Sequence, residues 1–220
     1  MSPVPADARV VLATHNAKKL RELRRILAEH IEGFDSSAVV SSAEIELPDV
    51  VEDGTTFAAN ALLKARAAAT ATGLIAVADD SGLAVDILGG APGIFSARWS
   101  GRHGDDEANN DLLLAQLSDI ADEHRGAEFR CAAAMAAPGP DGGLVETVEE
   151  GVMRGRLLRA RRGDGGFGYD PLFVPDGQAV GGDGGRELTS AEMTPEAKDA
   201  ISHRGRAFRA LAPAIAALLG

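Results

Sequence analysis

Two adjacent carboxylates, Asp79 and Asp80, are the residues of this sequence best suited to chemistry. They follow the apolar run Leu74–Ala78 and precede Ser81 and Gly82. Such a run predicts a buried strand, and ligands of open α/β sheets collect where strands end. We therefore expect the strand to end at the two acids and the chain to turn sharply at Ser81-Gly82. Paired acids there suit a divalent cation or a general base, and an ordinary solvated turn is the equally weighted alternative.

A second candidate site lies near the N-terminus. A strand over Val10–Ala13 leads through Thr14-His15-Asn16 into a helix over Lys18–Ile31, whose leucines recur at spacings of three and four. Lys18 and Lys19 fall in the first turn, where they and the free backbone N–H groups would converge on an anion. No P-loop pattern is present. For this segment alone, lysines on a solvated helix face are the commoner explanation.

A third segment predicts a helix over Phe57–Thr72, capped by Thr56 and ended by Gly73. It is apolar almost all round, so we expect it to be buried. Lys64 is one of its two basic exceptions, and such a lysine either extends to water or meets an anion.

The rest of the chain predicts further elements at the following places. They are a strand at Val39–Ser42, a helix at Asp105–Leu117, strands at Phe129–Ala137 and Leu144–Glu149 joined by a hairpin loop, a further strand at Val152–Leu158, a helix start at Thr194-Pro195-Glu196, and a closing helical segment Phe208–Leu219 broken at Pro213. In the glycine-rich stretch before Phe173, Phe167 could stack on a flat ligand. Residues 176–187 are polar and rich in glycine, which predicts a mobile loop.

Composition narrows the class of protein. The chain has 220 residues and a formal net charge of -11, which disfavours nucleic acid as a partner but allows a small anion in a local basic pocket. The single cysteine, Cys131, excludes a disulfide framework and fits a reducing cytoplasm. We expect no signal peptide, because the N-terminus lacks a basic start followed by an apolar core. We also expect no membrane span, because no apolar run approaches 18 residues.

Six motifs in this order resemble the inosine triphosphate pyrophosphatase family, over nearly the whole chain from Val10 to Leu211. The motifs are Leu12-Ala13-Thr14-His15-Asn16-Ala17-Lys18-Lys19, Thr56-Phe57 with Asn60-Ala61-Leu62-Leu63-Lys64-Ala65, Ala78-Asp79-Asp80-Ser81-Gly82-Leu83, Gly89-Gly90-Ala91-Pro92-Gly93 with Ser96-Ala97-Arg98, Gly166-Phe167-Gly168-Tyr169-Asp170-Pro171, and Ser202-His203-Arg204-Gly205.

The resemblance implies an α/β fold in which a mixed central β-sheet is flanked by helices. It implies one domain over residues 1–220, made of two lobes with a substrate cleft between them, and usually a homodimer. The activity that it implies is the Mg²⁺-dependent hydrolysis of non-standard purine nucleoside triphosphates (ITP, dITP and XTP) to the monophosphate and pyrophosphate. The expected partner is thus a nucleotide, with no nucleic acid and no membrane, in the cytoplasm.

The resemblance also assigns residues. Glu52 and Asp80 match metal-binding acids, and Asp80 also matches the proposed proton acceptor. For the phosphates it implies contacts by Thr14, His15, Asn16, Ala17, Lys18 and Lys19, and for the substrate also by Ser81 and Lys198. For recognition of the base it implies Phe167, Gly168, Tyr169, Asp170, His203 and Arg204. We add Lys64 as a lysine that meets an anion. Three positions depart from the family pattern, where His15 replaces a usual glycine, Ala59 a frequent glutamate and Arg161 a common proline.

Three other classes of protein are alternatives to this family. An aspartic protease needs two turns like Val77–Gly82, and this chain has one. A haloacid-type phosphatase needs D-x-D, whereas Asp79 and Asp80 are adjacent. A nucleotide-sensing module that binds without hydrolysis stays open.

Overall fold

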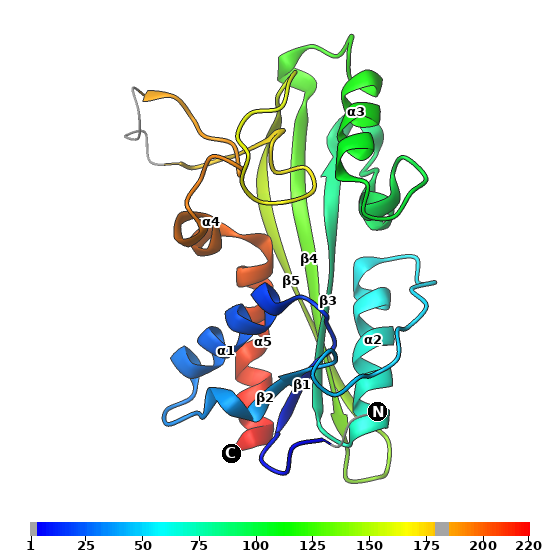
Figure 1. The fold of residues 1–220 in the computed structure, drawn as a ribbon, viewed down its shortest axis with the longest axis vertical. Helices are drawn as coiled ribbons and strands as arrows, with labels where there is room; N and C mark the ends of the chain where they lie inside the picture. The colour runs from blue at the N-terminus through cyan, green and yellow to red at the C-terminus, as the bar shows by residue number, and fades with distance from the viewer. Residues whose placement is uncertain (1–3, 179–184) are drawn as a thin grey trace. The chain divides into compact units, whose positions relative to one another are not determined.

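The computed structural model describes residues 4–178 and 185–220 (Figure 1). Its helices and strands are β1 (Val10–Leu12), α1 (Ala17–His30), η1 (Ser36–Ala38), β2 (Val39–Ser41), α2 (Phe57–Thr72), β3 (Ile75–Val85), η2 (Asp86–Leu88), η3 (Gly93–Arg98), α3 (Asp106–Gln116), η4 (Asp122–His124), β4 (Gly126–Pro138), β5 (Leu144–Leu157), β6 (Phe173–Pro175), α4 (Pro195–Ile201) and α5 (His203–Leu219). The η elements are single turns or short runs of 3₁₀-helix.

The strands form one six-stranded sheet in the order β2-β1-β3-β4-β5-β6. β1 is parallel to both of its neighbours, with Leu12 opposite Ser41 of β2 and opposite Val77 of β3. β5 and β6 are antiparallel. The sheet is therefore mixed and flanked by helices, which confirms the fold class predicted from the sequence.

Contacts divide the chain into two compact units. Unit 1 comprises the described residues of Met1–Asp80, Cys131–Gly151 and Arg204–Gly220, and unit 2 those of Ser81–Arg130 and Val152–His203. The expected cleft between two lobes stays a prediction.

Unit 1 has helices on both faces of its part of the sheet (Figure 1). One face carries Ile75 and Val77 of β3 and packs against α1 and α5. The other carries Ala76 and Ala78 and packs against α2. Because successive side chains of a strand point to opposite faces, the odd-numbered residues of the unit 1 part of β3 face α1 and α5, while its even-numbered residues face α2.

Unit 2 packs its own core around Leu83 and Val85 of β3, Leu113 of α3 and Phe173 of β6. Arg125 is buried beside that core. Its guanidinium donates hydrogen bonds to the backbone oxygens of Leu117, Leu157 and Leu158 at 2.7–3.0 Å, so the buried cation is satisfied by carbonyl groups.

β3 differs from its prediction. The strand does not end at the two acids but continues through Ser81 and Gly82 to Val85. Gly82 permits close approach instead of a turn, because a Cβ there would lie 2.4 Å from the Ser96 Oγ. That hydroxyl also accepts a hydrogen bond from the Leu83 backbone N–H at 2.9 Å. Pairing and packing in unit 2 therefore override the turn preference of Ser-Gly.

The helix boundaries predicted for α2 are confirmed, including the Thr56 cap and Gly73 in the left-handed conformation. The prediction that α2 is buried all round is wrong. Its buried residues lie on one side, and Arg66, Thr70 and neighbouring alanines are exposed. Alanine buries little area, so an alanine-rich helix can face water with little loss of free energy.

Two other predictions need correction. The closing helix is not broken at Pro213, because α5 runs through it to Leu219 while Leu211 and Ile215 pack in the core. Val152–Leu158 is not a separate strand, since all but its last residue belongs to β5. Of the predicted mobile loop 176–187, residues 179–184 lie outside the described residues.

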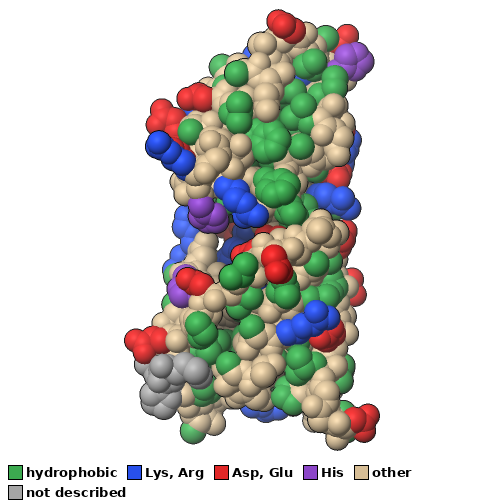
Figure 2. All heavy atoms as spheres, turned by 90° about the vertical axis from the view of Figure 1, so that its right-hand side faces the viewer, with side chains coloured by type: hydrophobic (Ala, Val, Ile, Leu, Met, Phe, Trp, Pro, Cys, Tyr) green, Lys and Arg blue, Asp and Glu red, His purple; other side chains and the backbone are tan. Residues whose placement is uncertain are grey.

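On the face shown in Figure 2, acidic and basic side chains are interspersed among apolar and uncharged ones. Within the two described stretches of chain, no helix is long and apolar enough to cross a membrane.

Candidate functional site

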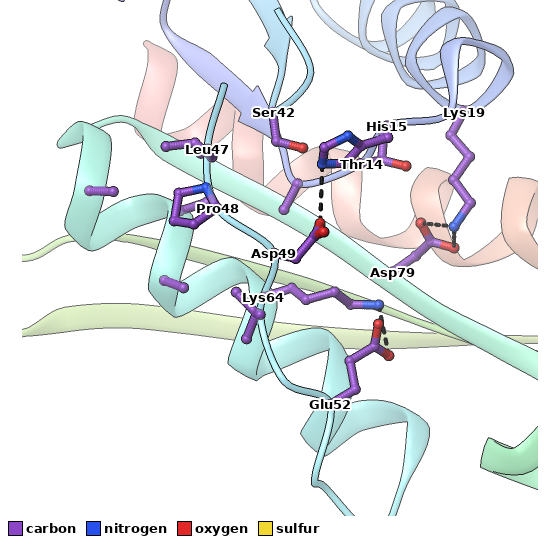
Figure 3. Close-up of a pocket in the computed structure, with 15 residues that line it drawn as sticks. Thr14, His15, Lys19, Ser42, Leu47, Pro48, Asp49, Glu52, Lys64 and Asp79 are labelled. Carbon is purple, nitrogen blue, oxygen red and sulfur yellow. Dashed lines mark hydrogen bonds and ion pairs between the residues drawn. The ribbon is translucent and has the colours of Figure 1, made fainter. Parts of the chain in front are cut away.

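A pocket of about 280 Å³ opens in unit 1 at the carboxyl ends of β1 and β2. Thr14 and His15 follow β1, Ser42 follows β2, and the segment after Ser42 contributes Asp49 and Glu52. Helices α1 and α2 add Lys19 and Lys64, and β3 adds Asp79 (Figure 3). Since β1 ends opposite Val77 while β3 continues, Asp79 lies just beyond the end of the shorter strand. The pocket thus occupies the position where parallel sheets bind ligands.

Asp79 anchors two cations within unit 1. Lys19 Nζ donates to its two carboxylate oxygens at 2.8 and 2.9 Å, and Arg204 Nε donates to Oδ2 at 3.0 Å. The Cys131 thiol lies 3.9 Å from the same Oδ2. Burial alone would raise the pKa of Asp79, but Lys19 and Arg204 together hold the pKa well below its usual range. Asp79 is therefore a fixed anion.

Asp80 faces the other side of β3, toward α2. Its Oδ2 accepts a hydrogen bond from Asn60 Nδ2 at 3.0 Å. Burial raises the pKa of Asp80 above its usual value, against the opposing effects of Lys64 and the Asn60 hydrogen bond, and the negative charges of Glu52 and Asp79 raise it further. A carboxyl group with a raised pKa is suited to accept a proton.

Lys64 and Glu52 form an ion pair at the pocket, with Nζ and Oε2 3.2 Å apart. The lysine extends from α2 toward the loop that carries Glu52 (Figure 3). Of the two alternatives for Lys64, the structure shows a lysine that meets an anion, supplied here by the protein itself. His15 Nε2 lies 3.4 Å from Asp49 Oδ1 on the exposed rim of the same pocket.

Comparison with known proteins decides the family. The model of the Ham1 family matches residues 10–214 of this chain. The chain belongs to the Ham1 family.

Ham1 relatives are similar over almost their whole length. A protein of Streptomyces coelicolor named dITP/XTP pyrophosphatase is 60% identical over 212 residues, covering 96% of this chain and 99% of the relative. A protein of Bifidobacterium longum with the same name is 53% identical over 250 residues, covering 96% of this chain and 99% of the relative.

Solved structures agree. The nucleoside-triphosphatase or dITP/XTP pyrophosphatase of Mycobacterium abscessus is 51% identical with a TM-score of 0.71, covering 93% of this chain and 99% of that one. A HAM1 protein of Coxiella burnetii is 36% identical with a TM-score of 0.78, and the match covers 94% of this chain and 98% of that one. The family resemblance found in the sequence is confirmed.

The N-terminal residues assigned to phosphate binding, Thr14–Lys19, do not all lie in the pocket. Thr14, His15 and Lys19 line the pocket. Asn16 caps α1, its Oδ1 accepting from the Lys18 backbone N–H at 2.9 Å. Ala17 and Lys18 begin the helix and are exposed.

The residues assigned to base recognition lie mostly in unit 2. Phe167 is 55% exposed, and Lys198 Nζ lies 5.2 Å from its ring centroid. Lys198 also pairs with Asp170, whose Oδ2 accepts from the Phe167 backbone N–H at 2.9 Å. Gly168, next in the chain, donates its backbone N–H to Asp106 Oδ2 at 2.7 Å. These contacts hold an exposed aromatic ring beside a lysine.

Three other residues assigned as substrate contacts are buried or partly buried within the fold. Tyr169 is buried and donates its hydroxyl hydrogen to the Ser96 carbonyl oxygen at 2.9 Å. His203 is buried in unit 2, stacked on Phe129 with centroids 5.1 Å apart. Ser81 lies within β3, partly buried.

Besides His15, whose contact with Asp49 is given above, the other two departures from the family pattern also have defined surroundings. Ala59 lies in the first turn of α2, where its N–H donates to Thr56 Oγ1. Arg161 donates to the Glu107 carbonyl oxygen and to Asp111 Oδ1, so it serves as a surface contact within unit 2.

Sequence reasoning missed two residues of the site. Strand alternation places adjacent acids on opposite sides, but it reveals the anchoring role of Asp79 only if the strand continues past Asp79, where the sequence predicted a turn. Asn60 was quoted only as part of a motif. A buried amide four residues before Lys64, on the same helix face, was the available signal.

Proposed function

We propose that this protein hydrolyses non-standard purine nucleoside triphosphates (ITP, dITP and XTP) to the monophosphate and pyrophosphate, and that it requires Mg²⁺. The observation that carries the proposal is the unit 1 pocket, which is lined by Lys19, Lys64, Glu52 and Asp79, with Asp80 following Asp79 on β3. Membership of the Ham1 family and the names of the relatives support the substrate class.

The phosphates bind at the lysines. A triphosphate carries about four negative charges, and charge-assisted hydrogen bonds from ammonium groups are among the strongest that proteins make. Lys19 and Lys64 come from helices on opposite faces of the sheet, so they meet the phosphate chain from two sides. The first turn of α1 adds backbone N–H groups.

The acids fit a hard divalent cation. Among residues 4–178 and 185–220, no group of three or more His, Cys, Asp or Glu side chains is arranged to hold a metal. Mg²⁺, however, prefers one or two carboxylates together with substrate phosphates and water. Glu52 and Asp80 can supply that number, although one carboxylate can hardly be both a direct metal ligand and a free base, so Asp80 takes one of the two roles. When bound, the cation would neutralise phosphate charge and polarise the α-phosphate.

The chemical step then follows from Asp80. Its raised pKa suits it to accept a proton from a water molecule that attacks the α-phosphorus. The new P–O bond forms as the bond from the α-phosphorus to the α,β-bridging oxygen breaks, and pyrophosphate leaves with that oxygen. Lys19, held on Asp79, stabilises the phosphate charge without moving.

The base is recognised by stacking and by donors. Phe167 offers its exposed face to any purine, with Lys198 beside the ring. His203 and Arg204 are the proposed donors to the 6-keto oxygen of hypoxanthine and xanthine. Adenine presents an amino group there, so donor would face donor. The resemblance further suggests a homodimer, and the buried, single Cys131 suits the cytoplasm.

Product analysis in ¹⁸O-labelled water tests this function. With ITP and Mg²⁺, we expect pyrophosphate and a monophosphate that carries the label, and no turnover in excess chelator. Label in the pyrophosphate would contradict attack at the α-phosphorus. Tight ITP binding without any product would instead identify a nucleotide-sensing module.

A further inference from the structure

We infer that Asn60 is a positioning residue for the reaction: it fixes the orientation of the Asp80 carboxylate and ties that carboxylate to the segment carrying Glu52. The inference rests on the proposed function, because it gives Asn60 a role only through Asp80.

Asn60 makes two hydrogen bonds with defined directions. Its Oδ1 accepts from the Gly54 backbone N–H at 2.8 Å, and its Nδ2 donates to Asp80 Oδ2 at 3.0 Å. A backbone N–H can only donate and an ionised carboxylate can only accept, so a flipped amide would face both partners wrongly. At 2% exposure, little water can replace either bond.

The amide sits on a rigid support. Asn60 lies in the first turn of α2, and its own backbone N–H donates to the Thr56 carbonyl oxygen at 3.1 Å. Thr56 Oγ1 caps that turn. The loop approaches so closely that a Cβ on Gly54 would lie 2.6 Å from Asn60 Oδ1. Only glycine allows this contact without displacement.

One face of α2 therefore holds both proposed acids. Residues four apart on a helix lie on the same side, and Lys64 follows Asn60 at that spacing. Lys64 forms an ion pair with Glu52. Asn60 forms hydrogen bonds both to Gly54, which lies two residues after Glu52, and to Asp80. Glu52 and Asp80 are remote in sequence, and Asn60 is a direct link between their two segments.

Removing the amide should let the Asp80 side chain rotate and loosen the segment that carries Glu52, while Lys19 stays in place. Loss of such a supporting contact typically lowers activity by about 10–100-fold. The loss should appear in kcat, because Lys19 keeps its anchor on Asp79.

The test compares Asn60→Leu, a change of similar shape without polar atoms, with Asn109→Leu. Asn109 is an equally buried helical asparagine whose Oδ1 accepts from the Ser100 backbone N–H at 2.7 Å, but its Nδ2 donates to the Ala97 carbonyl oxygen. The variants therefore remove similar bonds, and only one touches an acid. Measurements are kcat and KM for ITP with Mg²⁺, the Kd of non-hydrolysable α,β-methylene-ITP by calorimetry, and Tm.

We expect Asn60→Leu to lower kcat by about 10–100-fold, with the analogue Kd within about three-fold of wild type. Asn109→Leu should lower Tm by a similar amount and keep its kcat. A kcat for Asn60→Leu within about three-fold of wild type would overturn the inference, as would equal kcat losses in both variants. If the wild-type protein itself releases no pyrophosphate, the proposed function fails and this inference with it.

Discussion

Asp79→Asn should destabilise the protein strongly, because it removes the charge but not the shape of a buried anchor. The Asp79 side chain is 1% exposed, and its partners Lys19 and Arg204 are 19% and 12% exposed. Removing the counter-charge of buried cations typically costs about 3–5 kcal/mol. Lys19 faces the pocket and can be partly hydrated, and Glu22 also acts electrostatically on Arg204, so we expect the lower end, about 3 kcal/mol.

That free energy corresponds to a measurable fall in Tm. For a chain of this size, about 2–4 °C is lost per kcal/mol, so thermal unfolding followed by circular dichroism should show a fall of roughly 6–12 °C. The matched control is Glu146→Gln, which breaks an exposed two-hydrogen-bond pair with Arg66 at 2.7 and 2.8 Å. Exposed pairs contribute about 0–1 kcal/mol.

The stabilisation that Asp79 provides should also depend on pH. The folded-state pKa of Asp79 lies below its unfolded value of about 3.9. Its stabilisation is thus complete above that value and is lost as the pH falls toward the folded pKa. The difference in urea stability between wild type and Asp79→Asn should be constant from about pH 8 to 5 and shrink below about pH 4. A Tm for Asp79→Asn that falls no further than that of Glu146→Gln would refute the reasoning.

The remaining predictions concern the chemistry. Asp80→Asn should lower kcat for ITP by about 10²–10⁴-fold with a small change in Tm; more than a tenth of wild-type activity would exclude Asp80 as the proton acceptor. Glu52→Ala should raise the Mg²⁺ concentration needed for half-maximal activity by about 10–100-fold, measured by titration at saturating ITP. An unchanged Mg²⁺ requirement would remove Glu52 from the metal site.

Local signals in the sequence predicted much of the fold. The helix α2 was predicted with its observed bounds because Thr56 and Gly73 act on their immediate neighbours. The same holds for α4, which begins after Thr194 with proline at its first turn. Caps and apolar periodicity are properties of a few adjacent residues, so they can be recognised without knowing the tertiary structure.

The wrong predictions concern positions whose conformation is set by packing against segments remote in sequence. Ser81-Gly82 has the composition of a turn, yet it is extended because its neighbours belong to β3 and pack in unit 2. Pro213 removes one helical hydrogen bond, but burial of Leu211 and Ile215 keeps α5 continuous. Such outcomes depend on partners remote in sequence.

The site shows the same division. The lysine-bearing loop and the paired acids could be predicted from residue types and order. Their division between the two faces of β3 required the strand to continue past Asp79, which the sequence argued against. The link from Asn60 to Gly54 and Asp80 joins three segments, and no local pattern predicts it.

The most direct test of the central claim is the ratio of kcat/KM for ITP to that for ATP, with pyrophosphate as the measured product and Mg²⁺ in excess. A donor left unpaired against the amino group of adenine costs about 1–3 kcal/mol, so one contact predicts a preference for ITP of roughly 5–150-fold, and two predict more. A ratio near one would contradict the assignment of this protein to the hydrolysis of 6-keto purine nucleotides.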